Sequence, residues 1–550
     1  MPERTHNLLL KVMICGLILS LLPSCDGRRR KSAGSQEVAS SPTPAQPVLN
    51  GRPIAPDANK NQAGGEQEAA EYARSANNEE YNQINENEFL EAINNPLSTF
   101  SIDVDSASYS NVRRFINDGM LPPRDAVRIE EMINYFRYDY AEPEGDEPFS
   151  INAEMAECPW NSGHKLIQIG LQGKKMPVED LPASNLVFLV DVSGSMNEPD
   201  KLPLLKSAFR LLVKQIRPQD RVAIVVYAGN AGLVLPPTSG DNGEAILKAL
   251  NSLEAGGSTA GGAGIQLAYK VAKDNFIRSG NNRVILATDG DFNVGVSSDE
   301  ELVRLIESKR DDGIYLTVLG FGKGNLKDSK MEQLADKGNG HYAYIDGISE
   351  ARKVMVTELG STLYTIAKDV KIQVEFNPAE VQAYRLIGYE NRLLRSEDFN
   401  DDKKDAGELG AGHSVTALYE IIPAGVAAHS SKVDGLRYQE KKVKPEAFGI
   451  NELMTIKLRY KPPSATESKM IARSIFDSDQ TLQTASSNLK FSAAVAEFGL
   501  LLRDSKFKSK ATYANCLALA RQAVGNDEGG HRAEFISLVE KTGSLKQRAD

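Results

Sequence analysis

Five oxygen-bearing side chains stand in three short motifs that could together bind a cation. Asp191, Ser193 and Ser195 form an Asp-x-Ser-x-Ser motif, Thr259 follows a glycine-rich loop, and Asp289 lies in a Thr-Asp-Gly motif. The set contains no imidazole and no thiolate. Hard oxygen ligands with few carboxylates suit Mg²⁺, with Mn²⁺ and Ca²⁺ as the alternatives. The residue types therefore predict a divalent-cation site.

The elements around these motifs must bring them to one place. The five apolar residues Leu186–Val190 predict a buried parallel strand that ends at Asp191. In open α/β sheets, ligands bind outside the carboxyl ends of the strands. Alternating strands and helices predict a doubly wound parallel sheet. Further strands are expected at Arg221–Tyr227, Arg283–Ala287 and Tyr315–Gly320, and helices from Leu202 onward and at 243–253, 260–277, 298–312 and 327–337.

The order and spacing of the motifs carry a family resemblance. D-x-S-G-S, a loop threonine and T-D-G resemble the von Willebrand factor type A (VWA) domain over about residues 183–360. The resemblance implies a metal-ion-dependent adhesion site. Mg²⁺ wants six ligands, so water or the carboxylate of a partner protein would fill the vacant position. The implied ligands are the hydroxyls of Ser193, Ser195 and Thr259, with Asp191 and Asp289 binding directly or through water.

The flanking sequences also resemble a family, the bacterial YfbK-type proteins. The resemblance rests on residues 101–136, on Cys158-Pro159-Trp160, and on the carboxyl-terminal stretches ELMTIKLRYKPP and FSAAVAEFGLLLRDS. It covers nearly all of the chain after residue 95 and implies the architecture of that family.

Alternating polarity on both sides of the α/β region predicts antiparallel sheet. We expect 149–176 and 368–461 to form one β-sandwich into which the VWA domain is inserted; two unrelated β segments are the alternative. The expected fold class is multidomain α/β: a Rossmann-like doubly wound VWA domain in a β-sandwich, with a helical carboxyl-terminal region. The expected parts are a signal peptide (1–25), a flexible linker (26–95), an amino-terminal helical segment (96–148), the first sandwich strands (149–180), the VWA domain (181–362), the remaining sandwich (363–461) and the helical region (462–550).

The first 25 residues predict an export signal. Val12–Leu22 is an apolar run too short to span a bilayer comfortably. Leu22-Pro23-Ser24-Cys25 resembles a bacterial lipobox, which implies lipidation at Cys25. We therefore expect a protein anchored by lipid to a membrane of the cell envelope, with its folded part outside the cytoplasm. The leaflet stays open, and an uncleaved signal anchor is the alternative.

Composition excludes some function classes and leaves other points open. The chain has 64 basic and 74 acidic residues, a net charge of −10, which disfavours nucleic acid as a partner. Cys158 and Cys516 could form a disulfide or remain two buried thiols. Asp103 and Asp105, beside Ser106 and Ser108, mimic a cation cluster, but we expect a strand end followed by helix-capping side chains.

Two functions remain after this weighing. The first is a membrane-tethered, divalent-cation-dependent module that binds an acidic side chain of a partner protein. The alternative is an envelope assembly scaffold in which the metal site is structural. An enzyme is not expected, because no base stands ready to activate Ser193 or Ser195, and His341 is expected in a turn.

Overall fold

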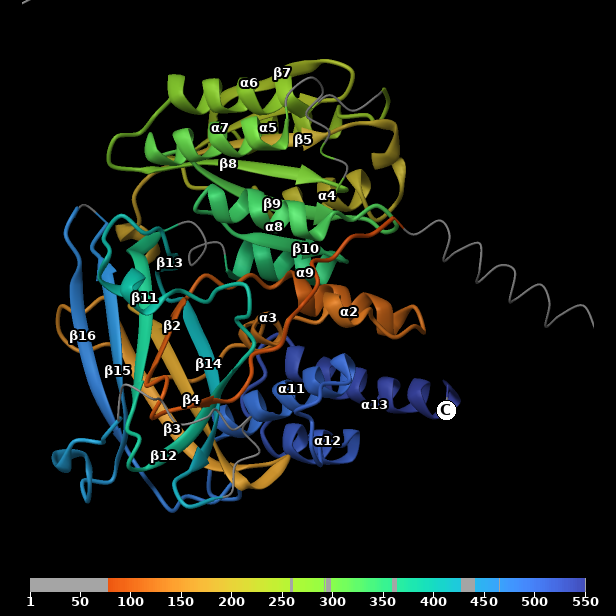
Figure 1. The fold of residues 1–550 in the computed structure, drawn as a ribbon. Coiled ribbons are helices and arrows are strands. Elements are labelled where there is room, and N and C mark those ends of the chain that lie inside the picture. The colour runs from red at the N-terminus through yellow and green to blue at the C-terminus, as the bar shows by residue number, and fades with distance from the viewer. Residues whose placement is uncertain are drawn as a thin grey trace, which may run out of the picture. The chain divides into compact units, whose positions relative to one another are not determined.

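The computed structural model describes residues 78–257, 261–290, 292, 298–358, 364–426, 441–463 and 465–549. They all lie in one compact unit, Glu68–Asp550. Within it, the elements form a six-stranded sheet covered by helices, a pair of antiparallel sheets and a group of helices (Figure 1). Cys25 and the predicted signal peptide lie outside the described residues.

The six-stranded sheet is centred on β5. Its strand order is β10-β9-β8-β5-β6-β7, and β5 pairs in parallel with both β8 and β6. Only β7, at the edge, runs antiparallel to its neighbour. The strands are β5 (Ser184–Asp191), β6 (Arg221–Tyr227), β7 (Ala231–Ser239), β8 (Asn281–Thr288), β9 (Tyr315–Phe321) and β10 (Tyr342–Ile345).

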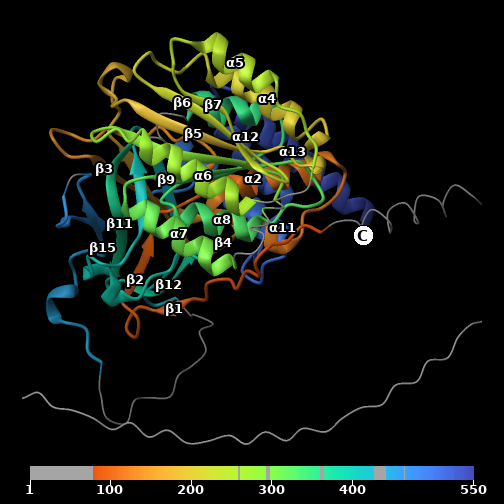
Figure 2. The ribbon, with the colours of Figure 1, turned by 90° about the horizontal axis from the view of Figure 1, so that it is seen from above.

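Helices cover both faces of this sheet, which explains the unbroken apolar run of β5. Phe188 packs on one face with Phe209 of α4, whereas Leu189 packs on the other with Ile265 of α6. Figure 2 shows α4 and α5 on one side and α6, α7 and α8 on the other. Burying each such side chain contributes roughly 1.5–3 kcal/mol. The helices are α4 (Leu202–Leu212), α5 (Gly243–Asn251), α6 (Gly261–Asp274), α7 (Asp299–Asp311), α8 (Asp328–Lys337) and α9 (Ile348–Arg352).

Two antiparallel sheets form the sandwich. One has the order β1-β12-β14-β4-β3; the other has the order β13-β11-β15-β16, with β2 also paired to β11. Strand β4 precedes the VWA domain and pairs with β14, which follows it, as the predicted insertion requires. The strands are β1 (Leu90–Glu91), β2 (Leu97–Ser101), β3 (Phe149–Cys158), β4 (Asn161–Gly173), β11 (Thr365–Phe376), β12 (Val381–Ile387), β13 (Gly407–Gly410), β14 (Ser414–Pro423), β15 (Glu452–Lys461) and β16 (Lys469–Phe476).

The remaining helices share one core with the outer face of the sandwich. The stripe Phe491, Val495, Phe498 and Leu502 of α11 is buried in that core, which confirms that it is ordinary core. Among the described residues, no helix is both long and apolar enough to cross a membrane. The helices are α2 (Ala107–Asn117), α3 (Ile129–Asn134), α11 (Ser487–Arg503), α12 (Tyr513–Gln522) and α13 (His531–Ala549).

The segment 78–95, assigned from its composition to the linker, packs against the folded body. Glu79 forms a 2.8 Å ion pair with Arg114 of α2, and Asn87 donates a hydrogen bond to a backbone carbonyl of β12. Strand β1 then extends the first sandwich sheet. Ion pairs and hydrogen bonds to the backbone hold this segment in place. The prediction of a flexible linker was wrong here because it rested on the low apolar content of the segment, which does not report such polar contacts.

Besides β1, three more strands were not predicted or were assigned elsewhere. β7 and β10 lie at the two edges of the VWA sheet, where pairing on one side tolerates short or proline-containing segments. β16 continues the sandwich beyond residue 461, in a stretch assigned to the helical region. Its largely exposed side chains hide the alternation expected of a half-buried strand.

Both cysteines of the described chain are buried free thiols. Cys158 ends β3, and Cys516 of α12 donates a hydrogen bond to the carbonyl oxygen of Ala494 at 3.2 Å. Burial raises the pKa of each thiol well above its usual range. Of the two arrangements left open by the sequence, the structure has the free thiols.

Glu497 of α11 provides a test of this core. Its side chain is fully buried, Oε1 accepts a hydrogen bond from the Thr512 backbone N–H, and Oε2 has no partner among the described residues. Desolvation raises the pKa of Glu497 from 4.5 to about 7, so the folded state favours the neutral acid. Folding stability is then lost as the pH rises from about 4.5 through 7, by about 3 kcal/mol.

We expect Glu497→Gln to keep the acceptor and remove this cost. The variant should unfold at higher denaturant than the wild type at pH 8, and the difference should vanish near pH 4.5. Chemical unfolding at both pH values measures this, with exposed Glu157→Gln as the control. A pH-independent difference would contradict the assignment.

Candidate metal site

The predicted ligands gather at the carboxyl edge of the VWA sheet. Asp191 is the last residue of β5, and Asp289 directly follows β8, the adjacent parallel strand. Both acids are buried, and so is Ser193. Ser195 lies in the 3₁₀ turn Gly194–Asn197 and is exposed. The site therefore has a buried acidic floor and a hydroxyl at the surface.

Backbone hydrogen bonds fix the first loop of the site. The Ser193 N–H donates to Asp191 Oδ1 at 2.8 Å, and the hydroxyls of Ser193 and Ser195 lie 3.0 Å apart. The Gly194 N–H donates to the Gly257 carbonyl at 3.1 Å, which ties this loop to the glycine-rich loop. Thr259, two residues further along, lies outside the described residues. The structure thus brings together four of the five predicted ligands.

The chemistry of Asp191 fits a cation. Its Oδ2 is buried and has no hydrogen-bond partner among the residues that the structure describes. Desolvation raises the pKa of Asp191 to about 6, interactions with Ser193 and with the hydroxyl of Tyr227 oppose the rise, and the charge of Asp289 adds to it. A buried carboxylate oxygen without a partner is costly, and a cation would relieve that cost. The all-oxygen donor set matches the preference of Mg²⁺.

Lys201 is a further residue of this site, and no sequence motif indicated it. Its ammonium group donates to Asp289 Oδ2 at 2.9 Å and to the Ser195 carbonyl at 3.0 Å, and the residue is buried. Gly322 makes room for it, since a Cβ there would lie 2.3 Å from the Lys201 Cε. The position of Lys201 at the start of α4 gave no signal, because an exposed lysine is the usual occupant there.

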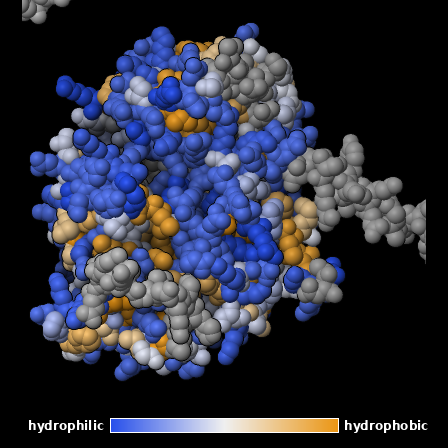
Figure 3. Space-filling view, viewed as in Figure 1, coloured by the Kyte–Doolittle hydropathy of each residue, from blue (hydrophilic) through white to orange (hydrophobic). Residues whose placement is uncertain are grey.

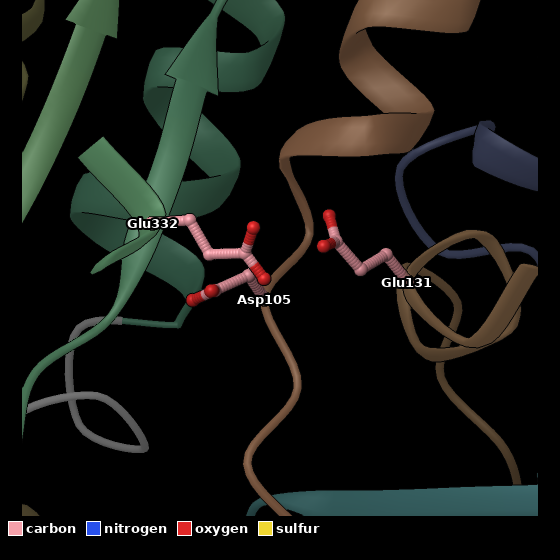
Figure 4. A group of neighbouring side chains, drawn as sticks. All are labelled: Asp105, Glu131 and Glu332. Carbon is pink, nitrogen blue, oxygen red and sulfur yellow. The ribbon is translucent and has the colours of Figure 1, made fainter. Parts of the chain in front are cut away.

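A second acidic cluster lies away from the site. Asp105, Glu131 and Glu332 come from the segment before α2, from α3 and from α8 (Figure 4), with ligand atoms within 4.8 Å of one another. Arg128 lies 3.0 Å and Arg392 3.1 Å from Glu332. Burial raises the pKa of Asp105 and Glu131 well above the usual range. We assign the cluster to an ion-pair junction that joins VWA helix α8 to the rest of the unit.

The neighbouring serines do not cap α2 with their side chains as predicted. Ser106 is the N-cap residue, yet its hydroxyl makes no capping bond and lies 3.5 Å from His341 Nε2. The Ser108 hydroxyl donates to the Ala126 carbonyl and accepts from the Arg128 N–H. The capping prediction was wrong for these side chains because partners distant in sequence compete for them.

Family models match three stretches of the chain. Residues 186–291 match the von Willebrand factor type A domain, 75–168 match a model described as von Willebrand factor, and 361–545 match the carboxyl-terminal region of "Uncharacterized protein YfbK". The relative of that name from Escherichia coli K12 is 44% identical over 467 residues, covering 84% of this chain and 80% of its own length. The chain belongs to the YfbK family.

Other relatives share less with this YfbK-type chain. The Synechocystis protein sll0103 is 29% identical over 170 residues. The matched region covers 30% of this chain and 39% of that protein. A solved von Willebrand factor type A protein from Catenulispora acidiphila is 14% identical, with a TM-score of 0.38, covering 81% of this chain and 90% of its own. BatB from Bacteroides thetaiotaomicron is 22% identical, with a TM-score of 0.28, covering 32% and 97%.

The ion-pair junction predicts a large effect for Arg392. Its guanidinium forms ion pairs with Asp103, Asp105, Glu332 and Asp336. Arg392→Leu therefore removes a positively charged partner from all four acids, of which Asp105 and Glu332 are buried. We expect a loss of about 3–5 kcal/mol in unfolding free energy. Denaturant unfolding measures it, with Arg395→Leu, which removes a largely exposed guanidinium, as the control. Equal effects of the two variants would contradict the assignment.

Proposed function

We propose that this YfbK-type protein is a protein-binding module whose central contact is a divalent cation, Mg²⁺ in preference to Mn²⁺ or Ca²⁺. VWA domains are generally protein-interaction modules. The observation that carries the proposal is the orphaned, buried Oδ2 of Asp191 beside two hydroxyls at an open sheet edge. An arrangement with exposed Ser195 above buried acids suits a ligand that approaches from solvent.

The residues of the site would divide the task among them. Asp191, Ser193, Ser195 and Asp289 would hold the cation, with Thr259 as the fifth ligand implied by the family. When bound, the cation supplies a directional, charge-assisted contact to an acidic side chain of a partner protein. The hydrogen bonds of Ser193 and Gly194 keep the loop in place for this.

The surface supports a polar mode of recognition. On the face shown in Figure 3, hydrophilic residues predominate and hydrophobic ones form separate groups. Broad exposed apolar patches mark hydrophobic interfaces. A charge-based contact suits a face of this kind.

The proposed location is the bacterial cell envelope. Cys25 would carry acyl chains, and more than one chain is needed for stable anchoring. The stretch that precedes the packed segment at residue 78 would then tether the folded body to the membrane. The acidic net charge of −10 makes nucleic acid an unsuitable partner.

An assembly scaffold is the second candidate function. The ion-pair junction favours it, because Arg128 and Arg392 tie the VWA domain to its neighbours through buried charges. In that case the cation would stabilise the fold and contact no partner.

The proposal assigns no catalysis to the site. His341 precedes β10, which runs parallel to β9, so this histidine lies at the opposite edge of the sheet from Ser193. It contacts Asp105, with Nδ1 3.3 Å from the carboxylate. It is therefore out of reach as a base for either serine.

Calorimetric titration with Mg²⁺ and Mn²⁺ tests the proposed site. We expect saturable binding to the wild type and stabilisation of about 2.7 kcal/mol at a hundredfold excess over Kd. Asp191→Ala should lose both while its circular dichroism stays unchanged. Asp312→Ala, which removes an exposed carboxylate paired with Lys273, should behave as wild type. Equal binding by wild type and Asp191→Ala would sink the proposal.

Membrane fractionation of cells tests the anchor. We expect Cys25→Ser to release the protein from the membrane pellet, whereas Cys158→Ser should stay there. Retention of the Cys25→Ser protein in the membrane would favour the uncleaved signal anchor.

A further inference from the structure

Lys201 brings a positive charge into the proposed metal site. Its ammonium bonds to Asp289 Oδ2, and the side chains of Lys201 and Asp289 are 8% and 0% exposed. Both charges are therefore largely withdrawn from water. In such surroundings they interact strongly with other charges. Any cation that uses Asp289 must share it with Lys201.

The surrounding backbone is built to hold this lysine. Gly322 has a φ of +77°, in the region that favours glycine, and leaves the space that the Lys201 side chain fills. The Tyr344 hydroxyl donates to the Gly322 carbonyl at 2.8 Å and fixes that turn. A second bond from Lys201 to the Ser195 carbonyl joins it to the ligand loop. Lys201 is thus a fixed part of the site.

The charges of the site then decide how a cation is held. Of the charged side chains that the described part of the site brings together, Asp191, Asp289 and Lys201 carry one excess negative charge between them. A divalent cation would convert this into one excess positive charge. In a poorly solvated site such an imbalance is unfavourable, and one carboxylate from outside would cancel it.

We propose that Lys201 makes cation binding and carboxylate binding cooperative. The cation is held weakly alone and more tightly when a single carboxylate, such as that of an acidic partner side chain, binds with it. Lys201 is a positioning residue that acts through charge. This inference rests on the proposed metal site and adds to it the reason why an acidic partner would be required.

Mn²⁺ titration of the purified protein, followed by the electron paramagnetic resonance of free Mn²⁺, tests this coupling. Acetate is the probe carboxylate, and chloride at equal ionic strength is the reference. For wild type we expect acetate to tighten Mn²⁺ binding at least about fivefold, the lower end of common coupling strengths. Lys201→Met should bind Mn²⁺ about tenfold more tightly in chloride and change less than about twofold with acetate.

Matched variants separate charge from structure. Lys206→Met, one turn into the helix that Lys201 precedes, removes an ammonium that donates to the backbone carbonyls of Asn251 and Leu253 and should behave as wild type. Lys201→Arg keeps the charge and should keep the acetate effect. Should circular dichroism show that Lys201→Met does not fold, Lys201→Gln provides the same comparison.

Three outcomes would overturn the inference. Loss of Mn²⁺ binding in folded Lys201→Met would mean that Lys201 merely holds Asp289 in place. If Lys201→Met binds Mn²⁺ more tightly but keeps the full acetate effect, Lys201 only competes with the cation for Asp289 and does not couple it to the carboxylate. Absence of Mn²⁺ binding in wild type would overturn the proposed function as well, whereas the first two outcomes leave that function standing.

Discussion

The parallel pairing of β5 with β8 is the constraint on which the rest of the structure depends. It places Asp191 and Asp289 side by side at one edge of a sheet that helices bury on both faces. Burial removes water from these carboxylates, and this desolvation, with a smaller contribution from the charge of Asp289, keeps the pKa of Asp191 high. The hydrogen bond from the Ser193 N–H to Asp191 and the ammonium group of Lys201 beside Asp289 both stabilise the negative charge of these buried carboxylates.

The same use of buried charge joins the VWA domain to its neighbours. Arg113 of α2 contacts Asp346 and Glu350 of the VWA domain and Glu534 of α13. Such pairs add little net stability compared with apolar packing, because both partners lose water. They do specify one arrangement strongly, since a displaced partner leaves a buried charge alone. A ligand site on the VWA domain would thereby be held on a well-defined support.

The sequence predicted the parts whose signals are local. The apolar run Leu186–Val190 predicted the buried strand β5, and the acid and hydroxyl motifs at strand ends predicted the candidate site. The role of Lys201 could not be predicted, because its partner Asp289 is distant in sequence and only the fold brings the two side chains together. The order of segment 78–95 and strand β16 was not predicted either. Polar contacts hold the segment, and pairing at the edge of a sheet holds the strand. Periodicity reports apolar burial and is blind to these interactions.

Anomalous diffraction from crystals grown with Mn²⁺ tests the central claim most directly. The account predicts one strong anomalous peak at the carboxyl edge of the VWA sheet, with Ser193 Oγ, Ser195 Oγ and the carboxylates of Asp191 and Asp289 around it and Lys201 still bonded to Asp289. A structure at saturating Mn²⁺ with no peak at that edge would contradict the account.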